Sequence, residues 1–328
     1  MHYFSTWAII KKDNPMKGRI KMNKILLPNG LQVSPVALGA MDFGTTTSKD
    51  AAFSVLDAYL DMGGNFIDTS NNYAHWNGTG DESETLLGEY FASRKCRDRV
   101  VLATKVGFDR HGKGQGLKKE QIEYWIDESL RKLKTDYIDL YYAHTDDPNT
   151  PLEETMDAFH GLIEKGKVRH LGGSNYDTWR FSEANALAKT PYTVMQQWFT
   201  YLQARGDKAP QYLFNEYTSR ERLRYLEAKN IPLVAYSCLA KGGYANEDRL
   251  PEELVAGERL AVLQNMAKEK GITASALAVA WMVNLHRCEG FPRVIPLFGS
   301  SRVEHFVSNL TGAELTLTDR ELEQLNNA

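Results

Sequence analysis

Short runs of apolar, often β-branched residues alternate along the chain with longer amphipathic stretches. Apolar runs of this length are typical of buried strands, and apolar positions three or four residues apart predict helices. The eight predicted strands cover residues 36–40, 65–70, 99–106, 137–144, 168–174, 193–198, 232–237 and 293–298. The predicted helices cover residues 49–62, 82–93, 118–134, 152–165, 177–188, 219–229 and 258–285.

Strands that alternate with helices indicate parallel β/α units, and the near-continuous apolar character of these strands indicates that both faces are covered. Two architectures fit: a closed eight-stranded barrel and an open doubly wound sheet that binds a dinucleotide. The open sheet should carry G-x-G-x-x-G after its first strand, and "VALGAMDFGTTTSKD" at 36–50 lacks it. The sequence therefore predicts an α/β protein with a single-domain (β/α)8 TIM barrel.

The segment before the first barrel strand has its own pattern. "KILLPNGLQV" at 24–33 has a turn signal at Pro28-Asn29-Gly30 and predicts a β-hairpin that closes the bottom of the barrel. Residues 1–22 are interpreted as an N-terminal extension, and residues 23–328 as the barrel domain. The apolar stretch near the N-terminus is too short and too interrupted to be a signal peptide.

Composition narrows the possible partners and the compartment. The 328 residues carry a formal net charge of -3, which favours neither nucleic acid nor an anionic membrane as a partner. The longest apolar segment, 274–285, is too short for a membrane span and predicts a buried helix. Three cysteines, Cys96, Cys238 and Cys288, lack C-x-x-C spacing. We therefore expect a cytoplasmic protein without a structural metal site.

Candidate catalytic residues stand where predicted strands end, which is the functional face of such a barrel. Asp68 and Lys105 end adjacent strands and can form a partly buried ion pair, and Tyr73 follows on the next loop. The ammonium group would lower the pKa of the Tyr73 phenol, and His144 could hydrogen-bond the reacting oxygen or relay a proton. Each residue alone also has an ordinary structural explanation. Together they predict a general acid for a substrate oxygen that becomes an alkoxide.

Several segments, in this order, resemble the signatures of the aldo-keto reductase superfamily. They are "GNFIDTSNNY", "GDESETLLGEY", "LATKVG", "DLYYAHTDD", "GGSN" and "LVAYSCLAKG", and the resemblance covers residues 23–320. It implies a catalytic tetrad of Asp68, Tyr73, Lys105 and His144, with Tyr73 as the proton donor. Lys105 and Asp68 would tune the pKa of Tyr73, and His144 would orient the substrate.

The resemblance also implies a nicotinamide cofactor site. Ser174, Asn175 and Gln196 would hold the carboxamide, and Tyr236 would stack on the nicotinamide ring. The remaining implied cofactor residues are Met41, Asp68, Ser237, Leu239, Lys241, Gly299, Ser301, Arg302, His305 and Asn309.

Three positions depart from the family pattern near the adenosine end of that site. Gly299 and His305 stand where many members carry Lys and Arg for the 2′-phosphate of NADP, and Ser308 replaces a common Glu. "QQWFTYLQAR" at 196–205 also departs from the usual Gln-x-x-Tyr-Asn pattern. Arg302 lies between Gly299 and His305 and can grip a phosphate bidentately. We therefore expect NADP(H) as the cofactor, with NAD(H) possible.

Aromatic residues on the strand-end loops suggest a substrate pocket. The candidates are Phe43, Trp76, Phe108 and Trp198, with Phe199 and Tyr201 beside them. Aromatic faces and the polar segment around Trp76 suit a sugar-like carbonyl compound.

The main functional hypothesis is an NAD(P)H-dependent reductase of an aldehyde or ketone. One alternative is a lyase that forms a Schiff base on Lys105, although Asp68 would raise the pKa of that lysine and disfavour it. The other is a non-catalytic, nicotinamide-binding regulatory subunit, because a complete tetrad can persist in a slow enzyme.

Overall fold

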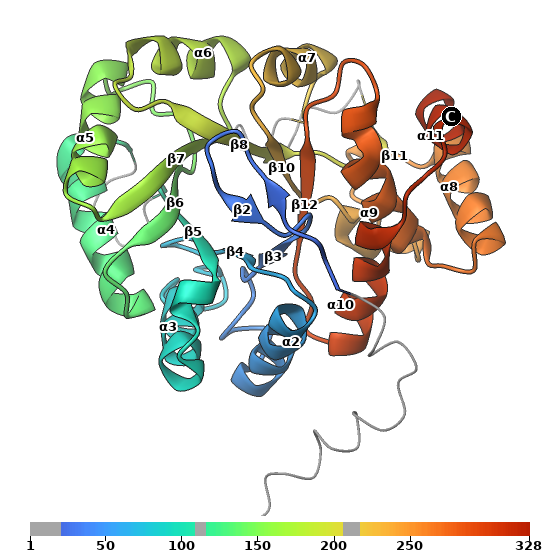
Figure 1. The fold of residues 1–328 in the computed structure, drawn as a ribbon, viewed down its shortest axis with the longest axis horizontal. Helices are drawn as coiled ribbons and strands as arrows, with labels where there is room; N and C mark the ends of the chain where they lie inside the picture. Colours follow the sequence, from blue (N-terminus) through green and yellow to red (C-terminus); the bar gives the residue numbers. More distant parts are fainter. Residues whose placement is uncertain (1–20, 109–115, 206–216) are drawn as a thin grey trace, which may run out of the picture.

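Eight parallel strands form a closed barrel (Figure 1), as predicted. The computed structural model describes residues 21–108, 116–205 and 217–328. The barrel closes because the last strand, β12, pairs with both the first, β3, and β10. In chain order the strands are β3 Ala37–Gly39, β4 Phe66–Asp68, β5 Val101–Val106, β6 Ile138–Ala143, β7 Val168–Ser174, β8 Tyr192–Trp198, β10 Leu233–Tyr236 and β12 Val294–Phe298. Each lies within one of the predicted strands or extends one residue beyond it.

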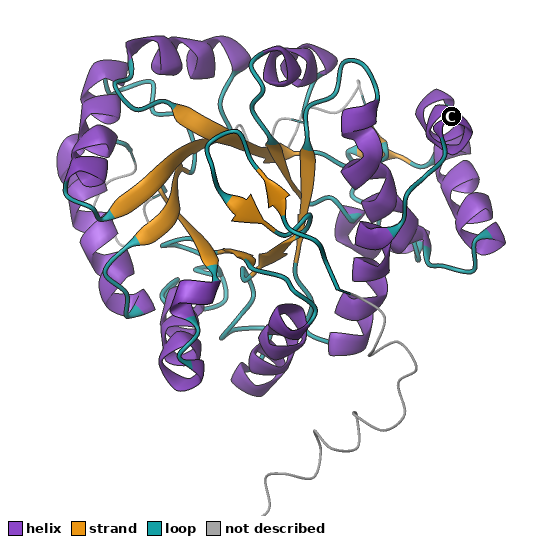
Figure 2. Cartoon of the chain, viewed as in Figure 1, coloured by secondary structure: helices purple, strands orange, loops and turns teal. Residues whose placement is uncertain are grey.

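Helices form a ring around the strands (Figure 2). They are α2 Lys49–Asp61, α3 Glu82–Arg94, α4 Lys119–Leu133, α5 Leu152–Glu164, α6 Thr178–Leu187, α7 Arg220–Ala228, α8 Gly257–Glu269, α9 Ala274–Asn284, α10 Val303–Leu310 and α11 Asp319–Asn327. Short 3-10 turns lie at η1 Arg97–Arg99, η2 Ala240–Gly242, η3 Glu247–Arg249, η4 Leu285–Arg287 and η5 Thr311–Glu314. A small antiparallel sheet joins β9 Gln203–Ala204 to β11 Leu254–Val255.

The segment 258–285, predicted as one helix, forms two helices, and the buried helix predicted separately for 274–285 is confirmed as α9. Gly271 follows α8 with a φ of 66°, a left-handed conformation that ends the helix. Thr273 then starts α9, since its side chain accepts a hydrogen bond from the Ala276 amide. The apolar residues of both helices gave one continuous pattern that hid this break.

The predicted hairpin is present at the bottom of the barrel. β1 Ile25–Leu26 pairs antiparallel with β2 Gln32–Val33, and both cross the barrel end that faces the viewer in Figure 1. Leu27, Leu31 and Val33 join the cluster of inward-facing side chains inside the barrel. The hairpin therefore closes this end with apolar side chains. Residues 1–20 of the predicted extension lie outside the described residues, whereas Met22 is buried in the core.

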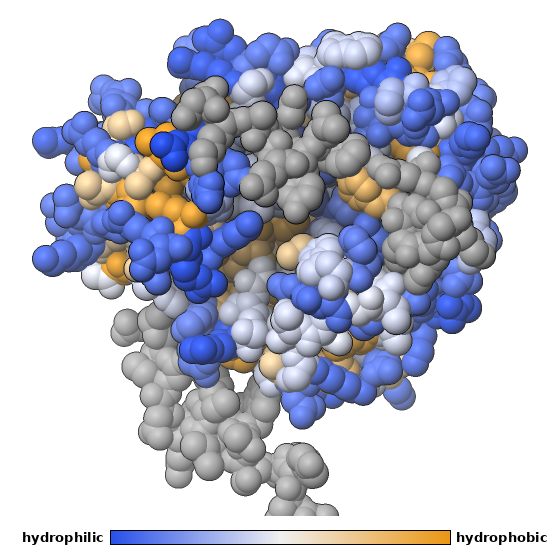
Figure 3. All heavy atoms as spheres, turned by 180° about the vertical axis from the view of Figure 1, so that it is seen from behind, coloured by the Kyte–Doolittle hydropathy of each residue, from blue (hydrophilic) through white to orange (hydrophobic). Residues whose placement is uncertain are grey.

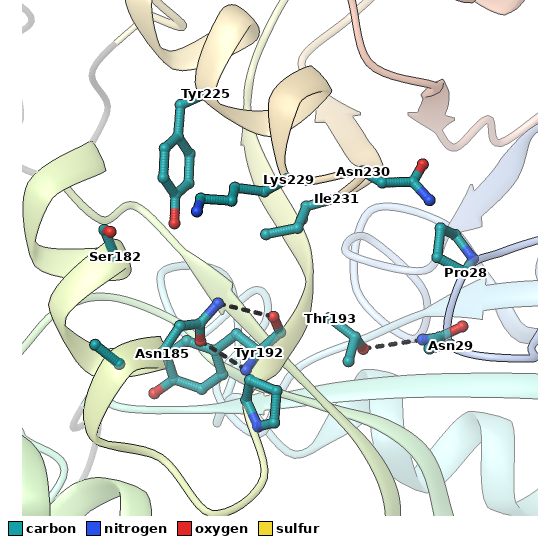
Figure 4. Close-up of a pocket in the computed structure, with 12 residues that line it drawn as sticks. Pro28, Asn29, Ser182, Asn185, Tyr192, Thr193, Tyr225, Lys229, Asn230 and Ile231 are labelled. Atoms are coloured by element: carbon teal, nitrogen blue, oxygen red, sulfur yellow. Dashed lines mark hydrogen bonds between the residues drawn. The ribbon is translucent and has the colours of Figure 1, made fainter.

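A cavity of about 440 Å³ lies at this same closed end, between the hairpin turn, α6 and α7 (Figure 4). Asn185 brackets the backbone of Tyr192 with two hydrogen bonds, and Asn29 donates to the Thr193 hydroxyl at 2.9 Å. These bonds tie α6 and the hairpin to the start of β8. The cavity therefore lies at the opposite end from the predicted catalytic residues.

Side chains of the strands alternate between the barrel interior and the helical layer. On β5, Val101 and Ala103 belong to the interior cluster, whereas Leu102 and Val106 pack among the outer residues. By the same alternation, the Lys105 side chain points into the barrel and the Thr104 side chain points toward the helices. This alternation places the lysine inside the mouth of the barrel.

Candidate active site

A buried ion pair forms the centre of the site at the C-terminal ends of β4 and β5. Asp68 is the last residue of β4 and is aligned with Ala103 of the neighbouring strand, two residues before Lys105. The Lys105 Nζ lies 2.5 Å from Asp68 Oδ1, and neither side chain is exposed. The sequence predicted this pair as partly buried, and the structure shows it fully buried.

All three hydrogens of the Lys105 ammonium group have an acceptor. Besides Asp68, Nζ donates to the Thr69 carbonyl oxygen at 2.7 Å and to the Tyr73 hydroxyl at 2.6 Å. Burial lowers the pKa of Lys105, and the Asp68 carboxylate acts in the opposite direction. A buried charge is tolerated only when it is paired and hydrogen-bonded, and this lysine meets both conditions.

Tyr73 completes the cluster from the loop between β4 and α3. Its hydroxyl accepts from Lys105 and donates to Asp68 Oδ1 at 3.1 Å. Burial, followed by the Asp68 charge, raises the pKa of Tyr73 well above its ordinary value. The expected net lowering of this pKa is therefore wrong, because burial and Asp68 outweigh the neighbouring Lys105 ammonium group. Tyr73 is a phenol at neutral pH and retains a proton that it can donate.

His144 lies beside this cluster, just after β6. Its Nδ1 is 3.1 Å from the Ser70 hydroxyl, and its ring meets the edges of Tyr73 and Phe108 with centroids 5.8 and 4.7 Å away. Burial and the nearby Lys105 charge lower the pKa of His144 well below its ordinary value. The imidazole is therefore neutral at physiological pH, which suits a hydrogen-bonding role better than a proton-donating one.

A second polar group connects to the same carboxylate. Gln196 on β8 donates through Nε2 to Asp68 Oδ2 at 2.9 Å. Asn175, whose φ is 55°, donates through Nδ2 to the His144 carbonyl oxygen and, more weakly, to the Ser174 hydroxyl. Tyr236 donates its hydroxyl hydrogen to Asn175 Oδ1 at 2.7 Å. The residues predicted to hold the nicotinamide thus adjoin the predicted tetrad.

The other predicted cofactor residues lie at the same end of the barrel. Met41 follows β3 and is 41% exposed. Ser237 and Lys241 follow β10 with left-handed φ values of 51° and 53°, and Leu239 lies between them. Gly299, Ser301, Arg302, His305 and Asn309 follow β12 and line the start and body of α10.

Close packing explains the glycine at position 299. A Cβ atom there would come within 2.4 Å of the Gly39 carbonyl oxygen, which is a backbone atom that cannot turn aside. The lysine that the sequence resemblance would imply at this position is therefore incompatible with this backbone. Arg302, the N-cap of α10, is exposed, and its backbone N–H donates to the Ser300 hydroxyl at 3.1 Å.

The predicted substrate aromatics occupy different environments. Trp76 is 55% exposed, Phe108 is half-buried against His144, and Trp198 is buried. Phe43 is 1% exposed and packs in the core, as do Phe199 and Tyr201, which both contact the Trp281 ring. Figure 3 shows the face opposite the hairpin, with a hollow near its middle in which hydrophobic residues are visible.

One anchoring network was missed in the sequence, although the segment that carries it, "GDESETLLGEY", was noted. The Ser83 hydroxyl lies 2.6 Å from that of Thr69 and donates to the Ala40 carbonyl oxygen at 2.7 Å. The Thr104 hydroxyl donates to Glu84 Oε1, also at 2.7 Å. The start of α3 is thus tied to β5 and to the ends of β3 and β4, which fixes both ends of the loop that carries Tyr73. The sequence signal from which this network could have been predicted was the group of polar residues beside the buried face of α3.

Two kinds of site are not found in the described parts of the chain. Within residues 21–108, 116–205 and 217–328, no group of three or more His, Cys, Asp or Glu side chains could hold a metal ion. None of the helices in these ranges combines the length and apolar character needed to cross a membrane.

Similarity to known proteins agrees with this geometry. Residues 35–328 match the model of the Aldo/keto reductase family. Aldo-keto reductase ausK of Emericella nidulans is 32% identical over 92% of this chain and 80% of that protein. The NADP(+) aryl-alcohol dehydrogenase of Phanerodontia chrysosporium is 29% identical over 98% of this chain and 88% of its own. A crystal structure of an aldo-keto reductase from Klebsiella pneumoniae in complex with NADPH has a TM-score of 0.73 at 27% identity, covering 94% and 95% of the two chains.

The chain therefore belongs to the aldo/keto reductase family. This confirms the resemblance seen in the sequence and agrees with the closed eight-stranded barrel. Reduction of a carbonyl compound with a nicotinamide cofactor is the activity that this membership supports.

Proposed function

We propose that this chain is an NADPH-dependent carbonyl reductase in which Tyr73 donates the proton. The observation that carries the proposal is the buried cluster in which Tyr73 shares hydrogen bonds with Lys105 and Asp68. A bound nicotinamide supplies the hydride that adds to the carbonyl carbon. The carbonyl oxygen gains negative charge at that moment and takes the proton of the Tyr73 hydroxyl.

The surrounding residues prepare this proton transfer. Lys105 donates to the Tyr73 oxygen and stabilises the phenolate that remains after the proton has left. Asp68 keeps Lys105 charged despite burial, and His144 in its neutral form hydrogen-bonds the substrate oxygen. In the structure the Tyr73 proton points to Asp68, so a bound substrate oxygen must take the place of that acceptor.

The chain fits a nicotinamide dinucleotide along the ends of β7, β8, β10 and β12. Asn175 and Gln196 present side-chain amides beside the tetrad, where they suit the nicotinamide carboxamide. At the other end, the bare backbone at Gly299 and the first turn of α10 form a place for a phosphate group. These features, together with the family membership, support the cofactor-binding roles of the predicted residues.

Preference for NADPH over NADH rests on Arg302. It is exposed at the start of α10, and no carboxylate pairs with it in the part of the chain that the structure describes. Its guanidinium group is therefore available to the 2′-phosphate. The two positions where the resemblance implies a lysine and an arginine supply neither, since Gly299 carries no side chain and His305 is an exposed histidine. Two similar proteins are named with NADP(+) or NADPH, which supports the same choice.

The substrate class follows from the aromatic side chains at the open end. Trp76 and Phe108 offer rings to a flat or sugar-like carbonyl compound. The name of the aryl-alcohol relative supports testing aromatic aldehydes beside aldoses. The Schiff-base alternative has less support, because every hydrogen of the Lys105 ammonium group is already engaged.

Turnover of the full-length protein tests the proposal. A panel of aromatic aldehydes, ketones and aldoses is incubated with NADPH or NADH, and cofactor oxidation is followed. We expect reduction of at least one carbonyl class, faster with NADPH. Tight cofactor binding with no turnover on any member would instead support a non-catalytic, nicotinamide-binding subunit.

A further inference from the structure

A fully buried carboxylate, Glu84, lies behind the catalytic strand on α3. Its Oε1 accepts the Thr104 hydroxyl hydrogen at 2.7 Å, and its Oε2 lies 3.5 Å from Lys132 Nζ without a hydrogen bond. Lys132 is held more closely by Asp81, at 2.7 Å. Two carboxylates thus share one ammonium group.

The neighbour of that charge across β5 is the catalytic lysine. Thr104 and Lys105 are consecutive residues of one strand, so their side chains point to opposite faces. Glu84 meets Thr104 on the outer face, while Lys105 meets Asp68 on the inner face. Strand β5 separates the two groups, and both are fully buried, so water screens their interaction weakly.

Anchoring alone does not require a charge at position 84. The hydrogen bond from Thr104 needs only an acceptor oxygen, which a glutamine amide also provides. An ionised carboxylate in a fully buried position is costly to maintain, and Lys132 compensates it only in part.

We propose that Glu84 is a positioning residue whose negative charge, held against β5 by Thr104, keeps Lys105 in the ammonium form that the Tyr73 proton donor needs. The inference rests on the proposed function and adds to it an electrostatic support from outside the barrel. The direction agrees with the physical chemistry of the site, since Glu84 and Asp68 both act to raise the pKa of Lys105 against burial.

Among the described groups around Lys105, Asp68 is the other one that carries a negative charge. Asp68 faces Lys105 from β4, Tyr73 from the loop above, and the Tyr142 ring lies 5.9 Å from Nζ on β6. His144 on the same rim is neutral, because its pKa is lowered well below the ordinary value.

Besides Thr104 on β5, groups on α4, β6 and the start of α3 surround Glu84. Lys132 on α4 and Asp81 at the start of α3 are its charged neighbours. The Glu84 charge also acts on Tyr141 of β6. Burial, followed by that charge, raises the pKa of the Tyr141 phenol. Glu84 is therefore the second carboxylate, after Asp68, that acts on Lys105 among the described residues.

The test is the alkaline limb of the kcat/KM profile, measured on the full-length enzyme with NADPH and its best carbonyl substrate. Glu84→Gln keeps the acceptor for Thr104 and removes the charge. We expect the apparent pKa of its alkaline limb to fall by about 0.5–1 unit. Without the Glu84 charge, Lys105 and Tyr73 both lose their protons more easily.

Two variants separate electrostatics from packing. Thr104→Val removes the hydrogen bond that holds the Glu84 carboxylate against β5, so it should lower Tm and move the alkaline limb down by no more than Glu84→Gln does. Asp139→Asn removes another buried carboxylate of the barrel, one paired with Arg97 and Arg169, and should likewise lower Tm without moving the limb.

An unmoved limb in Glu84→Gln, or an equal shift in Asp139→Asn, overturns the inference. Should Glu84→Gln fail to fold, Lys132→Met gives the same information with opposite sign. Removal of that cation should raise the limb, and a fall or no change contradicts the proposal. Loss of turnover in Tyr73→Phe tests the proposed function separately, so the two ideas can fail independently.

Discussion

Replacing Asp68 by Asn should destabilise the fold in a strongly pH-dependent way. Asp68 accepts hydrogen bonds from Lys105 and Tyr73 through Oδ1 and from Gln196 through Oδ2. An asparagine can keep the Oδ1 contacts, but its Nδ2 would face the Gln196 amide as donor against donor. It also leaves the Lys105 ammonium group without its buried counter-ion. Breaking a buried pair from one side costs about 3–5 kcal/mol.

The sign of the pH dependence follows from Lys105. Its folded-state pKa is already lowered by burial, and loss of the Asp68 charge lowers it further. Between this folded pKa and the unfolded value of about 10.4, the unfolded chain binds more protons, so stability rises with pH. The slope is at most about 1.36 kcal/mol per pH unit for one proton. The cost of Asp68→Asn should therefore be largest near neutral pH and smaller at pH ~9.5.

Urea unfolding followed by circular dichroism at both pH values measures this cost. Asp157→Asn is the matched control, because Asp157 pairs with Lys189 and both side chains are exposed. Its loss should cost no more than about 1 kcal/mol at either pH. The reasoning is refuted if Asp68→Asn behaves like this surface variant, or if its cost is the same at both pH values.

Two further predictions concern the adenosine end of the cofactor site. Arg302→Ala should weaken NADPH binding about ten- to a hundredfold while NADH binding changes little, as measured by fluorescence titration; equal loss for both cofactors would contradict the assignment. Gly299→Ala should destabilise the protein by about 1–3 kcal/mol, because its methyl group meets the Gly39 carbonyl oxygen. In the control Gly161→Ala, the added methyl group meets open space on α5, so stability should be unchanged or higher; equal Tm values for the two variants would rule out the clash.

The fold was largely predictable because its signals are local. Each barrel strand is a short apolar run, so periodicity located all eight to within a few residues. The α8–α9 boundary was missed, since apolar positions continue across it and the break depends on the backbone of Gly271 and the cap of Thr273. Where one helix ends and the next begins without a change in hydrophobicity, the sequence pattern shows little sign of the break.

The candidate site was predictable in its members but not in its electrostatics. Strand ends placed Asp68 and Lys105 side by side, because parallel strands present their carboxyl ends at one edge. The raised pKa of Tyr73 depends on complete burial beside Asp68, which sequence spacing cannot give. Glu84 was hidden for a similar reason, since only the folded chain brings α3 against the outer face of β5.

Single-residue removal of the Tyr73 hydroxyl tests the central claim most directly. Tyr73→Phe is compared with wild type in NADPH-dependent reduction of 4-nitrobenzaldehyde, and NADPH affinity is measured in parallel. Tyr141→Phe is the matched control, because Tyr141 is fully buried on the outer face of β6 and its hydroxyl has no hydrogen-bond partner in the described residues. We predict that Tyr73→Phe loses about 10²–10⁴-fold in kcat with NADPH affinity little changed, while Tyr141→Phe stays close to wild type. Near-wild-type reduction by Tyr73→Phe would contradict the role of Tyr73 as the proton donor.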